Sequence, residues 1–135
     1  RLNSGAPQGA VVAGGDNVLT VTASGASVLR IDFFMPGDFA VIAPMFGARL
    51  QSGAAFDVAW TESKDAGSYG VSVYRANPFG PVFDRAGIAS PLTVPAISYQ
   101  GGGTVTVRAS MGPLVDGNGS FIHRYVNQSI PVTIE

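Results

Sequence analysis

Few side chains in this sequence have the chemistry for hydrolysis. A hydrolytic triad needs a histidine to carry the proton between nucleophile and leaving group, and the chain has one histidine, His123 in "SFIHRYV". His123 shares its alternation phase with Phe121 and Tyr125, as a half-buried strand residue would. No Gly-x-Ser-x-Gly elbow marks a nucleophilic serine. We therefore predict no catalytic residues and no enzymatic activity, with a hydrolase as the least favoured alternative.

The carboxylates are scattered rather than paired. A glycosidase needs two of them on either side of one sugar, but most of these acids fall in expected loops or on the polar phase of expected strands. Solvated surface explains such positions, and nothing in the pattern implies a cofactor. The nine acids are Asp16, Asp32, Asp38, Asp57, Glu62, Asp65, Asp84, Asp116 and Glu135.

The segment "DGNG", residues 116–119, places Asp116 and Asn118 at alternate positions, as the start of a calcium loop would. The EF-hand loop also needs a third oxygen ligand and a distal glutamate, and neither occurs at the proper offset. Asp-Gly and Asn-Gly are above all turn formers, since Asp, Asn and Gly tolerate positive φ. A turn is the favoured interpretation, and whether this segment binds a metal is left open.

The aromatic residues divide into two groups. Phe79 and Phe83 lie in "NPFGPVFDR", which is rich in proline and glycine and is expected to be irregular. Exposed rings there would stack on sugars or dock a protein partner; the alternative is that the segment folds back and closes one end of the domain. The aromatics on apolar phases are expected in the core: Phe33, Phe56, Trp60, Tyr69 and Phe121.

Composition limits the class of protein. The chain has 135 residues, of which 46% are hydrophobic and 13% charged, and its net charge is −1. Without a basic stripe it is a poor match for nucleic acid or an anionic membrane surface. It has no cysteine, and no apolar run approaches the length of a spanning helix. The few charges and the small, polar opening from Arg1, like the tether after a removed signal segment, lead us to expect a secreted or cell-surface protein.

Period-two alternation dominates the sequence and predicts an all-β fold without helices. "FDVAW", "YGVSVYR" and "GTVTVRAS" each place apolar residues on one face and polar residues on the other. We expect a flexible tether over residues 1–16 and one β-sandwich domain over 17–135. Within that domain, residues 17–38 form a hairpin and 39–135 the core. "NPFGPVFDRAG" and "MGPLVDGNG" are expected to be loops.

The landmarks from Phe39 to Glu135 resemble an immunoglobulin-like β-sandwich of the fibronectin type III kind. "FDVAW" is similar to the second strand of that family, which ends in a core Trp, and "YGVSVYR" to the third. "VTVRAS" resembles the sixth strand and "IPVTIE" the last. The chain departs from the family in its N-terminal hairpin and in the long connection over residues 111–128. The absence of a cysteine pair disfavours an antibody-type domain.

The resemblance implies that loops 61–68 and 111–120 emerge at the same end of the sandwich. Recognition residues tend to lie on loops held by a rigid scaffold. The polar side chains that these loops would bring together, as a tip that could bind a ligand or a cation, are Glu62, Lys64, Asp65, Asp116 and Asn118.

The function expected from this architecture is a non-enzymatic module that binds or spaces at a cell surface and contacts a glycan or a protein through its end loops. The alternative is a self-associating structural subunit. A β-protein with few charges and uncapped strand edges can extend a sheet between chains.

Overall fold

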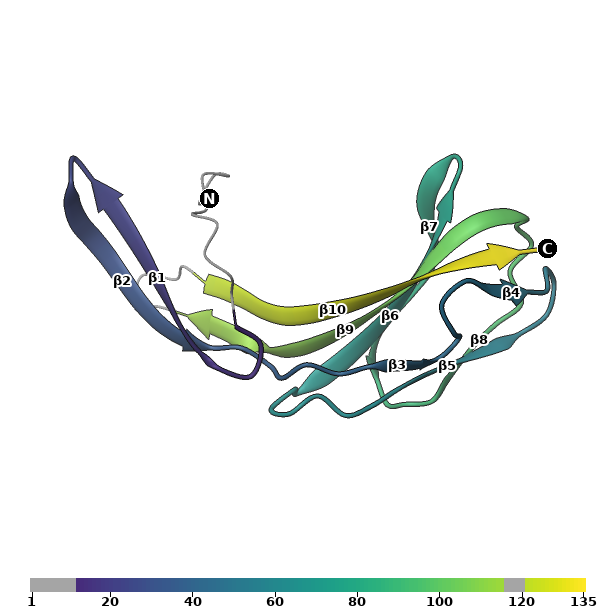
Figure 1. Ribbon diagram of the computed structural model, residues 1–135, viewed down its shortest axis with the longest axis horizontal. Coiled ribbons are helices and arrows are strands. Elements are labelled where there is room, and N and C mark those ends of the chain that lie inside the picture. The colour runs from purple at the N-terminus through teal and green to yellow at the C-terminus, as the bar shows by residue number, and fades with distance from the viewer. Residues whose placement is uncertain (1–11, 116–120) are drawn as a thin grey trace.

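The structure, a computed structural model, describes residues 12–115 and 121–135 (Figure 1). Ten strands and no helix occur in these two ranges. The strands are β1 (Asp16–Ala23), β2 (Ala26–Phe34), β3 (Val41–Ala43), β4 (Ala48–Leu50), β5 (Phe56–Trp60), β6 (Ser68–Ala76), β7 (Phe79–Ile88), β8 (Leu92–Val94), β9 (Gly101–Val115) and β10 (Phe121–Ile134). No helix capable of crossing a bilayer is found in the described part of the chain.

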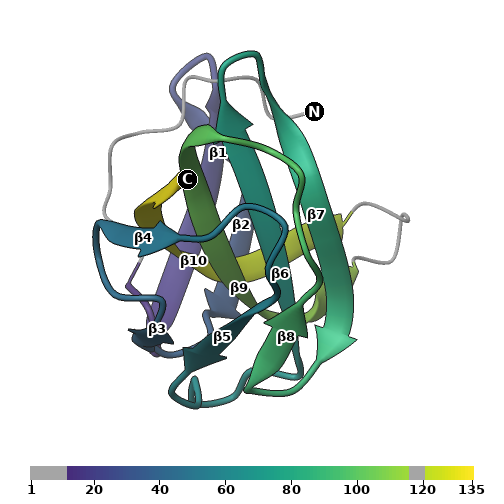
Figure 2. The ribbon, with the colours of Figure 1, turned by 90° about the vertical axis from the view of Figure 1, so that its right-hand side faces the viewer.

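Eight of these strands form two facing sheets (Figure 2). The larger sheet has the order β4-β10-β9-β6-β7, and the smaller has the order β3-β5-β8. All pairs are antiparallel except β4 with β10, where Ala48 lies opposite Val132. Two sheets with this strand order, packed face to face, form an immunoglobulin-like sandwich of the fibronectin type III kind. The all-β sandwich expected from the sequence is confirmed.

The core lies between the two sheets and follows the predicted alternation. Val71 and Val73 of β6 and Val105 and Val107 of β9 are fully buried, because the inward phase of each central strand faces the smaller sheet. Val58 of β5 belongs to the same buried cluster. A valine suits these positions because its branched side chain packs well on a pleated surface.

Two segments expected to be loops are strands. "FGPVFDRAGI" forms β7, which tolerates Pro81 because it is the edge of the larger sheet and needs donors on one side only. Residues 111–115 continue β9 past Ser110, where its pairing with β6 ends, so Pro113 has no β6 partner to satisfy. A proline is tolerated at a strand edge because no neighbouring strand needs its missing N–H there. The local sequence does not show which strands will be edges.

Strands β1 and β2 form a separate two-stranded sheet that stands away from the sandwich (Figure 1). Backbone hydrogen bonds from Gly14 N to the oxygens of Met35 (3.2 Å) and Pro36 (2.9 Å) close its base. Arg124 of β10 donates to Phe34 O (3.3 Å) and to Gly112 O (2.8 Å), which ties the hairpin to the β9–β10 ribbon. Phe33, expected in the core, lies on this hairpin, since residues 26–34 pair only with β1.

Most of the predicted tether, residues 1–11, lies outside the described residues, as do Asp116 and Asn118. The side chain of Phe121 is also not described. The division into a tether, a hairpin and a core therefore remains a prediction.

Candidate functional site

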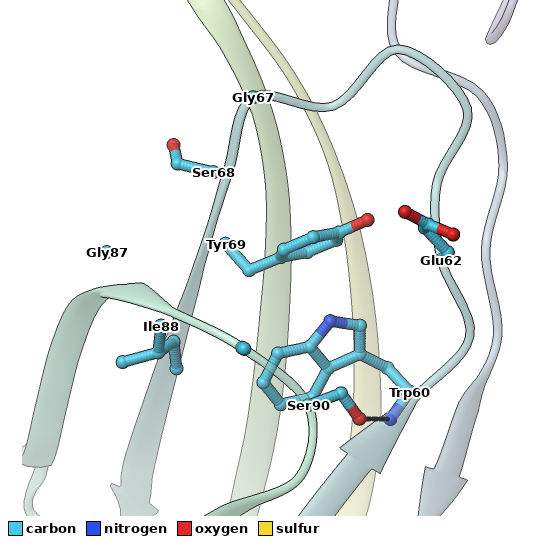
Figure 3. A pocket seen from close by; sticks show the side chains of 9 residues that line it. Trp60, Glu62, Gly67, Ser68, Tyr69, Gly87, Ile88 and Ser90 are labelled. Atoms are coloured by element: carbon cyan, nitrogen blue, oxygen red, sulfur yellow. Dashed lines mark hydrogen bonds between the residues drawn. The ribbon is translucent and has the colours of Figure 1, made fainter.

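A pocket of about 690 Å³ opens at one end of the sandwich, where the end of β5, the start of β6 and the end of β7 meet (Figure 3). It follows from the strand order, because β5 and β7 both run toward the end at which β6 begins. The residues that line it are Trp60, Glu62, Gly67, Ser68, Tyr69, Gly87, Ile88, Ala89 and Ser90.

Two aromatic rings form the apolar wall of the pocket. The side chains of Trp60 and Tyr69 are in contact, with ring centroids 5.6 Å apart and planes tilted by 47°. Phe39 and Tyr69 form a T-shaped pair, with ring centroids 6.3 Å apart, so the Tyr69 ring is packed against two other rings. Trp60 is only 4% exposed, whereas Tyr69 is half-buried and presents part of its ring to the pocket.

The loop that carries Glu62 is fixed by hydrogen bonds around Ser63. Ser63 N donates to Tyr69 Oη (2.7 Å), and Ser63 Oγ donates to Gly37 O (2.6 Å). Gly37 N in turn donates a hydrogen bond to Lys64 O (2.8 Å). At the far end of the loop, Gly67 N donates to Ser110 O (2.8 Å). Glu62 is therefore presented by a braced loop.

Ser63→Ala tests this bracing. Ser63 is 2% exposed, so its removal leaves Gly37 O buried without the hydroxyl donor. We expect a loss of about 1–2 kcal/mol in the free energy of unfolding, measured by urea denaturation. Ser68→Ala, at an exposed serine whose side chain makes no described hydrogen bond, should change the stability by less than about 0.5 kcal/mol. Equal effects of the two substitutions would show that the Ser63 bond does not brace the loop.

The pocket combines hydrogen-bond donors with an acceptor. Ser90 Oγ accepts a bond from Trp60 N (2.9 Å), which leaves the hydroxyl proton available (Figure 3). No described residue accepts a hydrogen bond from the indole Nε1–H of Trp60, and this nitrogen is not fully covered from solvent. The carboxylate of Glu62 is exposed and forms no hydrogen bond or ion pair with any described residue.

The predicted site residues divide among different parts of the fold. Glu62 lines the pocket, whereas Lys64 and Asp65 are exposed on the same loop but do not line it. Asp65 adopts a positive φ of 64°, as a turn residue does. Residues 111–115, expected to begin a loop, continue strand β9, and the expected meeting of this segment with loop 61–68 stays a prediction. Asp116 and Asn118 lie outside the described residues, so the calcium hypothesis stays a prediction.

The described part of the chain holds no cluster of three or more His, Cys, Asp or Glu side chains that could bind a metal ion. His123 was expected to be half-buried, but it is exposed on the outward phase of β10, beside Tyr125 on the same phase. The inward phase of this strand instead ends in Ile130, Val132 and Ile134.

Phe79 and Phe83 do not share a surface. Phe79 is 79% exposed at the β6–β7 turn, where its ring stacks on Tyr74 with centroids 5.6 Å apart and planes 5° apart. Phe83 is half-buried and packs against the core opposite Val73. The exposed stacking ring is therefore Phe79, and it lies at the opposite end of β6 from Tyr69 and the pocket.

Sequence patterns missed the roles of Tyr69 and Ser90 in the pocket. Tyr69 was expected as a core residue, and Ser90 follows a segment expected to be irregular. The signal that would have found them is the strand order, which brings the ends of β5 and β7 to the start of β6.

The fold and site define an immunoglobulin-like module with an aromatic pocket at one end of its sandwich. No protein-family model matches the sequence, and no curated protein matches it. Among solved structures, the fibronectin(III)-like modules of Clostridium thermocellum CbhA are similar to it at 15% sequence identity. The alignment covers 72% of this chain and 94% of the module, with a TM-score of 0.43.

Proposed function

We propose that this chain is a non-enzymatic, exported binding module that takes a sugar of a cell-surface or extracellular glycan in the pocket at Trp60, Glu62 and Tyr69. One observation carries the proposal: an unpartnered indole donor and an unpartnered carboxylate line the same aromatic pocket.

A sugar matches these groups better than a cation or an apolar ligand. A sugar hydroxyl both donates and accepts, so one face of a ring can donate to Glu62 while it accepts from Trp60 Nε1–H. The C–H face of a pyranose is apolar and suits contact with the Tyr69 ring. An ammonium or guanidinium group would satisfy Glu62, but it has no lone pair to offer the indole.

Binding rather than cleavage is favoured by the acids of the pocket. Glu62 is the one carboxylate among the lining residues, and glycoside hydrolysis generally uses two carboxyl groups across the scissile bond. The low share of charged residues supports an exported module. That conclusion rests on composition.

The single tryptophan of the chain gives a direct test, because it lines this pocket and no second tryptophan contributes to the fluorescence. The protein is titrated with hexaoses of cellulose, xylan, mannan and chitin, and the affinity of any responder is measured by calorimetry. Glu62→Gln is expected to weaken binding about tenfold or more, because it removes a hydrogen bond to a charged acceptor. Trp60→Phe keeps an aromatic wall but removes the indole donor, and should also weaken binding.

Asp65→Asn is the matched control. It makes the same carboxylate-to-amide change on the same loop outside the pocket, and Asn tolerates the positive φ at that position. Its affinity should equal that of the unaltered protein. The proposal is wrong if none of the four hexaoses changes the fluorescence, or if Asp65→Asn weakens binding as much as Glu62→Gln.

Self-association is the second candidate function, and one edge of the larger sheet favours it. Strand β10 pairs with β4 only through residues 132–134, so no strand of the described ranges pairs with that edge of residues 122–130. Beside this edge the β3–β4 loop, held by Gly47 N on Pro131 O (2.9 Å), exposes Met45 and Phe46. If a second copy adds a strand here, sedimentation equilibrium will show a mass above 13.9 kDa that rises with concentration. Phe46→Asp should then return the protein to a monomer.

A further inference from the structure

A second pocket, the basic pocket, lies on β9 and β10 near the point where the pairing of β9 with β6 ends. Its volume is about 410 Å³. Val107 and Ala109 of β9 are fully buried between the sheets, so Arg108 and Ser110, which alternate with them, belong to the outer face of the larger sheet. The residues that line the basic pocket are Arg108, Ser110, Met111, His123, Arg124 and Tyr125.

Arg108 is held in place by two uncharged side chains of β10. Its Nε donates to Asn127 Oδ1 (3.3 Å), and its guanidinium lies over the Tyr125 ring, 4.7 Å from the centroid. Asn127 is the residue directly opposite Arg108 in the strand register. No described residue accepts a hydrogen bond from Nη1 or Nη2 of Arg108, which is exposed. The guanidinium is therefore positioned without being neutralised.

Arg124 brings a second positive charge to the same pocket. Its Nε and Nη2 donate to Gly112 O (3.1 and 2.8 Å), and its Nη1 donates to Phe34 O (3.3 Å). These acceptors are backbone carbonyls, which carry no net charge. Arg124 is thus also fixed in position while it keeps its charge.

The basic pocket lacks a counter-charge among the described residues. None of its lining residues is an acid, and no described carboxylate forms an ion pair with either arginine. Other arginines do have such a partner, as Arg49 has in Glu135 (2.6 Å). Two positive charges at one pocket repel each other, and an anion between them turns that repulsion into attraction. The guanidinium fork suits the oxygens of an oxyanion such as a carboxylate or a sulfate group.

The basic pocket adjoins the proposed sugar pocket across the start of β6. Ser68, which lines the sugar pocket, lies directly opposite Ser110, which lines the basic pocket. A hydrogen bond from Gly67 N to Ser110 O (2.8 Å) fixes this junction. The side chains of Ser68 and Tyr69 leave β6 in opposite directions, so Ser68 points toward the outer face (Figure 3). A ligand that contacts Tyr69 and continues past Ser68 leads toward the two arginines.

We propose that the basic pocket binds the carboxylate or sulfate group of an acidic glycan, while a neighbouring sugar of the same glycan occupies the pocket at Tyr69. This inference rests on the proposed function and specifies the class of glycan. The adjoining pocket favours a glycan over an acidic peptide, because one sugar ring carries hydroxyls that both accept from the indole of Trp60 and donate to Glu62.

Calorimetry with the hexaoses of galacturonic acid and of mannuronic acid, each compared with its methyl ester, tests the proposal. The ester keeps the sugars and removes the charge. At least one acid should bind about fivefold or more tightly than its ester at low salt, as expected for pairing with exposed charges. This preference should disappear at about 0.5 M salt, which screens exposed charges. Binding of neither acid, or equal binding of acid and ester, would overturn the proposal.

Arg108→Gln should weaken binding of the acid about fivefold and leave binding of the ester unchanged, because only the acid pairs with the guanidinium. Arg85→Gln is the matched control. It removes the same charge from an exposed position on β7 that lines neither pocket, so the preference for the acid should persist. An equal loss in both variants would show an effect of net charge alone and would overturn the site.

Two further ligands identify the anion and its carrier. A hexaose of κ-carrageenan carries sulfate groups, and tighter binding of this hexaose than of both uronic acids, lost in Arg108→Gln, would assign sulfate as the anion. A hexaglutamate peptide carries carboxylates without sugars. Binding of this peptide as tight as that of the best hexaose would overturn the assignment to a glycan.

Glu62→Gln distinguishes a failure of this inference from a failure of the proposed function. If it weakens binding of the neutral ester while acid and ester bind equally, the sugar pocket is supported and the basic pocket is wrong. If the acid is preferred through Arg108 while Glu62→Gln leaves binding of the ester unchanged, the anion site is supported and the sugar pocket is wrong.

Discussion

Trp60→Ala is expected to lower the free energy of unfolding by about 3–5 kcal/mol, the range for removing a large aromatic side chain from a core. Trp60 is 4% exposed at the end of β5 and touches Tyr69, which in turn holds Ser63. The substitution leaves a cavity between the sheets and removes one wall of the pocket. A domain of this size has a total stability of about 5–15 kcal/mol, so this is a large share of it.

Urea denaturation followed by far-UV circular dichroism measures this effect, because the variant has lost the only tryptophan and with it the fluorescence signal. Trp60→Phe is the control: it keeps a ring in the core and should lose clearly less stability than the alanine variant. A loss below about 1 kcal/mol in Trp60→Ala would mean that the side chain lies at the surface, contrary to the packing described above.

Gly103→Ala is expected to cost about 1–3 kcal/mol, the range for overpacking an interior. Gly103 lies on β9 between Arg75 of β6 and Val132 of β10. A Cβ there would lie 2.9 Å from Tyr74 O, and a backbone oxygen of a central strand cannot move without shifting the sheet. The strands at this point approach more closely than a side chain allows.

Gly112→Ala makes the same change on the same strand, at a position where an added Cβ meets nothing within 4 Å. This variant should be neutral or slightly stabilising, because alanine restricts the unfolded chain more than glycine does. Urea midpoints of the two variants, measured side by side, distinguish a packing clash at Gly103 from a general destabilisation of β9 by alanine. Similar midpoints in both variants would contradict the close approach at Gly103.

The sequence predicted the core of the sandwich well. Val105 and Val107 were placed inward from alternation alone, as were Val58 and Trp60, and all four are buried. This works because one face of each strand packs against the other sheet, so burial has the same period of two as the side chains.

The sequence predicted the edges of the fold poorly. Residues 79–88 and 111–115 were expected to be irregular because they contain proline and glycine, yet they form strands. In each case the proline lies where one side of its strand has no described partner strand. Local sequence cannot reveal such a position, because it depends on which distant strand pairs and where that pairing stops.

The candidate sites show the same division. Glu62 was predicted as a candidate recognition residue from its loop, whereas Tyr69 and Ser90, which line the same pocket, could be placed there only from the meeting of β5, β6 and β7.

By itself, then, the sequence determined an all-β chain, its inward faces and the loop that carries Glu62, because these depend on residue type and on spacing within one segment. The tertiary structure alone decided that Trp60 Nε1–H has no described partner and that Arg108 and Arg124 line the same pocket. Whether a polar group is satisfied depends on atoms brought near it by strands far apart in the sequence.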